Sequence, residues 1–79
     1  MNIFDLKEIL KSEKISERYY LLDAKGIRED KTCLEYSDDL WQVYYSERGK
    51  KYNVATFSNE SDACDEVLQR LRELQKNIA

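Results

Sequence analysis

The stretch WQVYYSERGKKYNVATF, residues 41–57, decides the fold. Aromatic and β-branched residues, which are enriched in strands, fill both of its halves, and Gly49 lies between them. This pattern predicts a β-hairpin with strands over Leu40–Ser46 and Lys51–Phe57. The basic residues of the stretch lie at or beside the turn, where exposure to solvent is normal. A structural hairpin therefore accounts for the stretch without a nucleic-acid ligand.

Two registers are open at the turn of this hairpin. We expect a type I turn at Glu47 and Arg48 with Gly49 as a left-handed bulge, because a non-glycine residue fits poorly at positive φ. In this register one face of the hairpin packs into the core, and the opposite face carries a half-exposed aromatic surface that includes Tyr44 and Tyr52. A two-residue turn at Arg48 and Gly49 would shift the register by one residue. The expected register places Trp41 opposite Ala55 and predicts a core face formed by Trp41, Val43, Tyr45, Ala55 and Phe57.

Shorter elements are expected before the hairpin. Tyr19–Asp23 and Thr32–Tyr36 have the composition of strands, joined by a loop that contains Gly26. The polar segment Ser12–Glu17 is expected to turn the chain, and the turn formers Ser37, Asp38 and Asp39 close the second strand. A helix is expected over Asn2–Lys11, capped by Asn2, with an apolar stripe of Ile3, Phe4, Leu6, Ile9 and Leu10.

The last helix is the clearest element in the sequence. Ser58 or Asn59 is expected to cap it, and it runs to about Asn77. Acidic residues concentrate in its first half and basic residues lie towards its end, which suits the helix dipole. Its apolar stripe consists of Cys64, Val67, Leu68, Leu71, Leu74 and Ile78.

The order of these elements predicts a single α+β domain over residues 1–79. We expect an N-terminal helix, a three- or four-stranded antiparallel meander and a long C-terminal helix. Short loops between neighbouring strands favour a meander over a crossover topology. Each helix has one apolar stripe, so both helices are expected on the same face of the sheet, with the other face open to water.

The composition argues against catalysis, metal binding and cofactors. The chain has no histidine, its two glycines are far apart, and Cys33 and Cys64 do not form a C-x-x-C pair. It therefore lacks the commonest general base, a structural zinc motif and a glycine-rich phosphate loop. We predict no catalytic residue, no metal ligand and no cofactor. Both cysteines are expected to be reduced core thiols in a cytoplasmic protein, and a single disulfide between them is the minority alternative.

The charge argues against a nucleic-acid partner. The formal net charge is −3 and the pI is near 4.9, so the surface as a whole repels phosphate backbones. The helix–strands–helix order also fits the double-stranded RNA-binding domain, but that family needs a basic start to its last helix. The corresponding segment here, SNESDACDE, contains four acids and no lysine. Apolar runs are too short to span a bilayer, so no membrane partner is expected either.

Two segments carry a resemblance to a known class of proteins. WQVYYSERG at residues 41–49 and FSNESDAC at residues 57–64 resemble small bacterial immunity proteins of polymorphic-toxin and contact-dependent competition systems. This resemblance implies a stoichiometric inhibitor that binds a secreted toxin domain inside the producing cell. Many toxin domains that attack nucleic acid are basic, and an acidic inhibitor gains association rate by electrostatic steering.

We therefore expect a protein partner, in particular a basic toxin domain. The candidate partner-binding residues are the turn acids Asp38 and Asp39, the aromatic residues Tyr44 and Tyr52, and the helix acids Glu60, Asp62, Asp65 and Glu66. Each group has a structural explanation as well. The helix acids satisfy the dipole, and the tyrosines can pack across strands. A structural or adaptor module, for example a homodimer formed through an uncovered sheet face or edge, stays open as an alternative.

Overall fold

The structure of the chain, a computed structural model, describes residues 1–22 and 29–78, except for the side chain of Ile78. Asp23 and Gly26, where the first predicted strand ends and its loop turns, lie outside the described residues. The elements in chain order are the helix α1 (Ile3–Ser12), a 3₁₀ turn (Glu17–Tyr19), the strands β1 (Tyr20–Leu21), β2 (Lys31–Ser37), β3 (Leu40–Glu47) and β4 (Lys50–Phe57), and the helix α2 (Glu60–Ile78).

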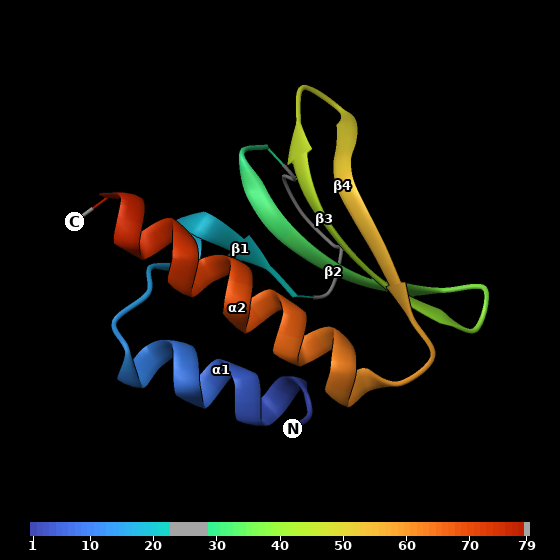
Figure 1. The fold of residues 1–79 in the computed structure, drawn as a ribbon, viewed down its shortest axis with the longest axis horizontal. Helices are drawn as coiled ribbons and strands as arrows, with labels where there is room; N and C mark the ends of the chain where they lie inside the picture. Colours follow the sequence, from blue (N-terminus) through green and yellow to red (C-terminus); the bar gives the residue numbers. More distant parts are fainter. Residues whose placement is uncertain (23–28, 79) are drawn as a thin grey trace.

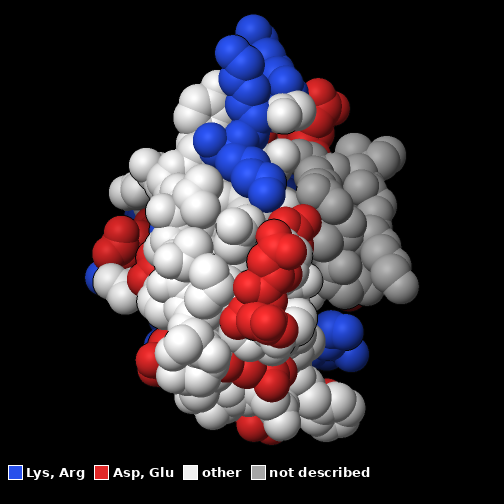
Figure 2. Space-filling model, turned by 90° about the vertical axis from the view of Figure 1, so that its right-hand side faces the viewer, with Lys and Arg blue, Asp and Glu red and all other residues white. Residues whose placement is uncertain are grey.

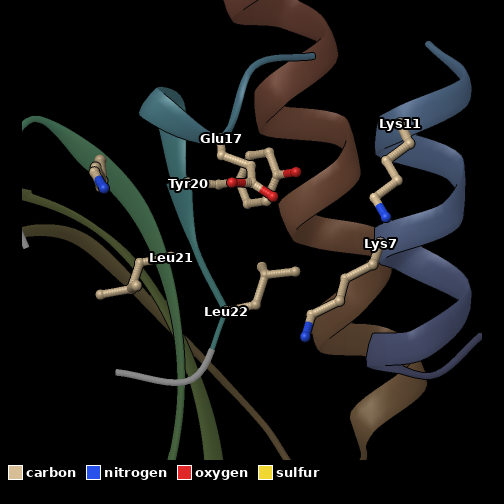
Figure 3. Close-up of a pocket in the computed structure, with 7 residues that line it drawn as sticks. Lys7, Lys11, Glu17, Tyr20, Leu21 and Leu22 are labelled. Carbon is tan, nitrogen blue, oxygen red and sulfur yellow. The ribbon is translucent and has the colours of Figure 1, made fainter. Parts of the chain in front are cut away.

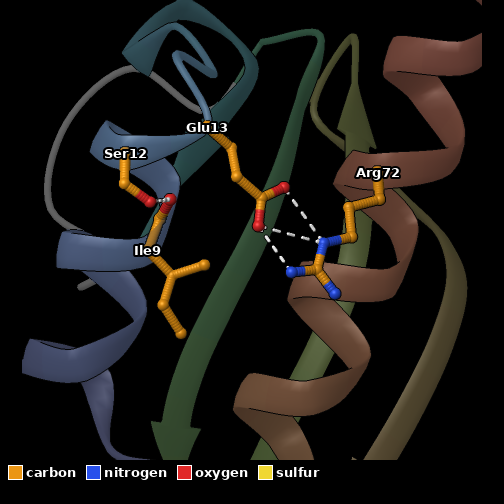
Figure 4. A network of polar contacts seen from close by, with 4 residues as sticks. All are labelled: Ile9, Ser12, Glu13 and Arg72. Atoms are coloured by element: carbon orange, nitrogen blue, oxygen red, sulfur yellow. Dashed lines mark hydrogen bonds and ion pairs between the residues drawn. The ribbon is translucent and has the colours of Figure 1, made fainter.

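The four strands form one sheet in the order β1-β2-β3-β4. Both helices lie side by side on one face of this sheet, as Figures 1 and 4 show, with α2 packed against β2, β3 and β4. The predicted α+β fold is confirmed, and so is the expected position of both helices on a single face.

The first strand departs from the expected meander. β1 pairs with β2 in parallel, with Tyr20 opposite Thr32 and Leu21 opposite Cys33, whereas every other pair is antiparallel. A parallel pair requires the chain between Leu21 and Lys31 to return to the end where β1 begins. A two-residue strand is only about 7 Å long, so a parallel pair here needs no long crossover. The antiparallel meander that short loops favoured therefore does not extend to β1.

Local capping explains where both helices begin. The side chain of Asn2 accepts a hydrogen bond from the Asp5 backbone N–H at 2.8 Å, and Asp5 accepts one from the Asn2 N–H, which makes a capping box. Asn59 does the same for α2 by accepting from the Asp62 N–H at 2.8 Å. The predicted helix starts are confirmed. Phe4, however, is exposed and does not join the apolar stripe of α1.

The core lies between the helices and the sheet. Leu6 and Leu10 of α1 are fully buried in it, together with Leu34 of β2 and Val43 of β3. The α2 stripe supplies Cys64, Val67, Leu68 and Leu71 as buried residues, with Leu74 partly buried at its edge. Both cysteines are buried and form no disulfide, as predicted.

A polar contact joins the two helices on their outer side. The Glu13 carboxylate, at the C-terminal end of α1, accepts hydrogen bonds from Nε of Arg72 at 3.0 and 3.2 Å (Figure 4). The Ser12 hydroxyl meanwhile donates to the Ile9 carbonyl at 2.9 Å, which occupies one of the last carbonyls of α1. The Arg72 guanidinium holds the pKa of Glu13 below its usual value. This pair is exposed, so it orients the helices more than it stabilises them.

The turn of the central hairpin differs from the expected one. Arg48 has φ 51° and Gly49 has φ 76°, and the strands close on the pair Glu47–Lys50. This is the two-residue turn, whose left-handed residues match the twist of the flanking strands. Our expectation of a type I turn with a bulge at Gly49 is wrong. The match between this turn and the twist of the strands therefore contributes more to stability than the positive φ of Arg48 costs.

The bulge lies inside β4 instead. The register shifts between Val43 and Tyr45, and Asn53 of β4 has φ 53° there. Trp41 consequently pairs with Phe57 rather than with Ala55. The Arg70 guanidinium of α2 donates to the Asn53 carbonyl at 2.7 Å, so the helix holds the bulge in place. The expected core face survives in part, because the turn and the bulge each shift the alignment by one residue. Val43 is buried, and Trp41 and Phe57 pack against the core, whereas Tyr45 pairs with the exposed Tyr52 and is not part of the core.

The turn can be tested by two substitutions with opposite effects. Arg48→Asn should stabilise the protein by about 0.5–1 kcal/mol, because asparagine tolerates the left-handed conformation better than arginine. Gly49→Ala should destabilise it by about 1 kcal/mol. An added Cβ would meet no atom within 4 Å, so the cost comes from backbone strain at positive φ and not from a clash. Urea unfolding at neutral pH measures both. Equal stabilities for the three proteins would contradict the two-residue turn.

The burial of Cys64 predicts a pH dependence of stability. Burial, with a smaller contribution from Glu60, raises the pKa of the Cys64 thiol to about 11. The folded protein therefore keeps this proton in a window in which the unfolded chain, with a thiol pKa near 9, has lost it. Stability contributed by the thiol should fall as the pH rises from about 9 to 11, by at most about 3 kcal/mol.

Urea unfolding of the wild type and of Cys64→Ala across this pH range measures the thiol's contribution. The tyrosines titrate in both proteins, so the difference between the two profiles isolates Cys64. The variant is expected to be less stable at neutral pH but to lose less stability on the alkaline side. Parallel profiles would show that the thiol is not desolvated.

Candidate functional site

The turn between β2 and β3 extends beyond the helices, at the right of Figure 1. Asp38 and Asp39 form it, with φ 53° and 63°, and the strands close on the pair Ser37–Leu40. Aspartate tolerates these angles because its short polar side chain bonds locally. Both acids are exposed, as expected for turn residues. Leu40, which is also exposed, lies beside them on the same tip.

An exposed aromatic residue lies next to these acids. Tyr36 of β2 pairs across the strands with Trp41 of β3, and the ring centroids are 4.7 Å apart at an interplanar angle of 50°. The Tyr36 hydroxyl lies 3.5 Å from Asp39 Oδ1, at the limit of a hydrogen bond. Trp41 is partly buried and packs against the core, whereas Tyr36 is 54% exposed. We call Tyr36, Asp38, Asp39 and Leu40 the acidic–aromatic tip.

The charges on this side of the molecule are segregated. Figure 2 shows Lys and Arg gathered at the upper end, where the β3–β4 turn stands in Figure 1, and Asp and Glu below them. Arg48 and Lys50 belong to that turn, and both are exposed. An extensive surface without charged residues lies beside the acids in the same view. A basic partner is therefore attracted to one part of this side and repelled from another.

Three of the four helix acids have structural partners. Glu60 accepts a hydrogen bond from the Ile3 backbone N–H at 2.8 Å, which ties the start of α1 to the start of α2. Asp62 belongs to the Asn59 cap, and Glu66 pairs with Arg70 at 2.6 Å. Asp65 is exposed. The partner-binding role of these acids stays a prediction, but replacing the first three would also disturb the fold.

The two predicted tyrosines do not form one exposed surface. Tyr44 is fully buried, with the Lys51 ammonium 4.6 Å from its ring centroid and the Glu35 carboxylate 3.4 Å from its hydroxyl. Tyr52 pairs with Tyr45 and is 43% exposed, on the opposite face of the sheet. The expected half-exposed aromatic face is thus wrong, because the two-residue turn pairs Tyr52 with Tyr45 instead of Tyr44 and so moves it to the other face.

Tyr36 is the exposed aromatic residue that the sequence analysis missed as a site. Its signal was available, since it directly precedes the Ser-Asp-Asp turn. Counting two residues for that turn places Tyr36 opposite Trp41. Composition predicts only that Thr32–Tyr36 is a strand and does not give its register.

No cluster of three or more metal-binding side chains occurs among residues 1–22 and 29–78. Within the same part of the chain, neither helix has the length and apolarity to cross a membrane. Comparisons with models of known protein families, with curated protein sequences and with solved structures found no similar protein. The function must therefore be argued from the surface itself.

Proposed function

We propose that this chain is a small acidic protein-binding module that acts as an immunity-type stoichiometric inhibitor of a basic toxin domain. The observation that carries the proposal is the acidic–aromatic tip. It combines a half-exposed tyrosine, packed on Trp41, with two exposed turn carboxylates, of which Asp39 lies 3.5 Å from the Tyr36 hydroxyl. No role in catalysis is assigned to any residue.

The chemistry of the tip fits a protein interface. Aromatic residues are enriched at binding hot spots, and Tyr36 is preorganised by its contact with Trp41, so little conformational entropy is lost when a partner covers it. The exposed acids around it raise the association rate of a basic partner without the desolvation that buried charges require. The resemblance of residues 41–64 to immunity proteins points to the same kind of partner.

The test requires a candidate basic toxin domain encoded beside the gene. Its association and dissociation rates with the chain are measured by surface plasmon resonance at low and high salt. Asp38→Asn with Asp39→Asn should slow association about 3- to 10-fold at low salt, because steering is lost. Asparagine is favoured in two-residue turns, so the tip should keep its shape. Tyr36→Ala should instead speed dissociation. If Tyr36 is a hot spot, the complex should lose about 2 kcal/mol or more of binding free energy.

Matched variants separate a specific surface from general effects. Glu8→Gln with Glu73→Gln changes the net charge equally at exposed positions on α1 and α2, and it should leave association nearly unchanged. Phe4→Ala removes an exposed aromatic side chain that belongs to no candidate binding group and should leave dissociation unchanged. If tip and control variants behave alike, the interface lies elsewhere. A toxin domain that neither binds the chain nor is inhibited by it would refute the immunity function.

The exposed edge of β4 favours a second candidate, a module that acts through homodimerisation. β4 is the outer strand of the sheet, and Val54 on it is 49% exposed. An exposed edge strand can pair with a second copy. Sedimentation velocity over a range of concentrations should then show a dimer that Val54→Lys weakens. A monomer at every concentration would remove this candidate.

A further inference from the structure

A cavity of about 420 Å³ lies between α1 and the β1 edge of the sheet (Figure 3). Its lining includes the lysines Lys7, Lys11 and Lys31, together with Glu17 and Tyr20. A volume of this size falls within the range of small-molecule sites. The cavity lies at the start of β2 and the acidic–aromatic tip at its end, and the charge of the cavity is the opposite, because cations predominate.

The fold brings these lysines to one cavity from two distant segments. Lys7 and Lys11 are four residues apart on α1, so they lie on the same face of the helix. Figure 3 shows Lys7 extending from α1 towards Leu22, whereas Lys11 runs along α1. Lys31 begins β2 and reaches the lining at the β1 edge from the sheet face opposite the helices, because it alternates with Thr32, which pairs with Tyr20. Like charges at this helical spacing are mildly destabilising. The helix dipole favours Lys11 in the last turn of α1, but it does not account for Lys7.

The positive charge of this cavity is not neutralised by the described residues. Among residues 1–22 and 29–78, none of the three lysines takes part in an ion pair. Glu17 is the acid in the described lining, which leaves two more positive than negative charges in a chain whose net charge is −3. Unpaired lysines so close together repel one another, and a bound anion would relieve that repulsion.

Two other cavities lined by described residues lack this imbalance. One, beside β4 and the end of α2, contains Arg70, which already binds Glu66 and the Asn53 carbonyl. The other, on the outer side of α2, has a balanced lining of Asp65, Glu73, Arg72 and Lys76. The excess of unpaired cations therefore distinguishes the cavity between α1 and β1.

We propose that this cavity is a binding site for a small organic phosphate, with Lys7 and Lys11 holding the phosphoryl group and Lys31 adding positive charge at the β1 edge. A phosphomonoester carries a charge of about −1.5 to −2 at neutral pH, which matches the excess positive charge of the lining. Lysine binds phosphate as a flexible point charge and does not require the fixed geometry of arginine. Leu21 and Leu22 add apolar lining that inorganic phosphate would leave unused.

Tyr20 and Glu17 give the site a direction. Burial and the nearby Glu17 carboxylate raise the pKa of Tyr20, so its hydroxyl stays protonated and can donate to an anion. Glu17 repels the phosphoryl group from its own side of the cavity and can accept a hydrogen bond from a hydroxyl of the ligand. The site thus favours a phosphate attached to a partly apolar, hydroxyl-bearing body.

The test is a titration of the full chain, labelled with ¹⁵N, with phenyl phosphate at pH 7.5 and low ionic strength, since a bound anion shifts nearby amide resonances. Saturable shifts are expected at Lys7, Lys11 and Tyr20 to Leu22, and weaker binding is expected for inorganic phosphate. The variant Lys7→Gln, Lys11→Gln, Lys31→Gln should bind phenyl phosphate at least about tenfold more weakly, because charge-assisted contacts are lost. Glu17→Gln should bind it more tightly.

A matched variant controls for net charge. Lys14→Gln, Lys50→Gln, Lys76→Gln neutralises three exposed lysines outside the cavity and should bind phenyl phosphate like the wild type. The site is refuted if this control loses as much affinity as the cavity variant. It is also refuted if shifts in the wild type do not saturate or are spread evenly over the surface. Weaker binding by Glu17→Gln would overturn the proposed orientation of the phosphoryl group.

Discussion

The alignment of β4 against β3 is the constraint on which the rest of the structure depends. A two-residue turn at Arg48–Gly49 starts the register, and the bulge at Asn53 shifts it by one residue before the strands reach Ala55. Without the bulge, the far end of β4 would present its apolar residues to water. Arg70 of α2 donates a hydrogen bond to the carbonyl of Asn53, so the contact between helix and strand is made at the bulge. Packing of the helix and strand register therefore support each other.

The parts of the fold that depend on local interactions could be predicted from the sequence. The helix starts follow from Asn2 and Asn59, whose side chains bond backbone groups three residues away. The α2 stripe follows from periodicity alone, since one helix has one buried face. These features determined the α+β class and the position of both helices. They required no knowledge of which strand neighbours which.

The features that could not be predicted depend on residues distant in sequence or on small energy differences. At Arg48 a backbone strain of about 1 kcal/mol opposes the better match between a two-residue turn and the strand twist. Residue propensities do not predict which of these two energies is larger. The burial of Tyr44 depends on Lys51 and Glu35, which belong to two other strands. The site was predicted in part. Asp38 and Asp39 lie at an exposed turn as expected, whereas Tyr36 becomes visible only when the β2–β3 register is known.

The division of charge in this chain separates residues that maintain the fold from residues that are available for binding. Glu60, Asp62 and Glu66 bond backbone groups or Arg70, so their charge is committed to the start of α2. Among the described residues, Asp38 at one end of the sheet and the lysines between α1 and β1 have no such partners, and Asp39 has the Tyr36 hydroxyl at 3.5 Å. Uncompensated charge usually lowers stability, and a small domain has little stability to lose. Such charge persists at low cost only where water solvates it, or where a ligand of opposite sign supplies the missing interaction. The tip reaches the core through Trp41, and the cavity borders it through Tyr20 and Leu22, so a partner bound at either place would contact residues that the fold already holds in position.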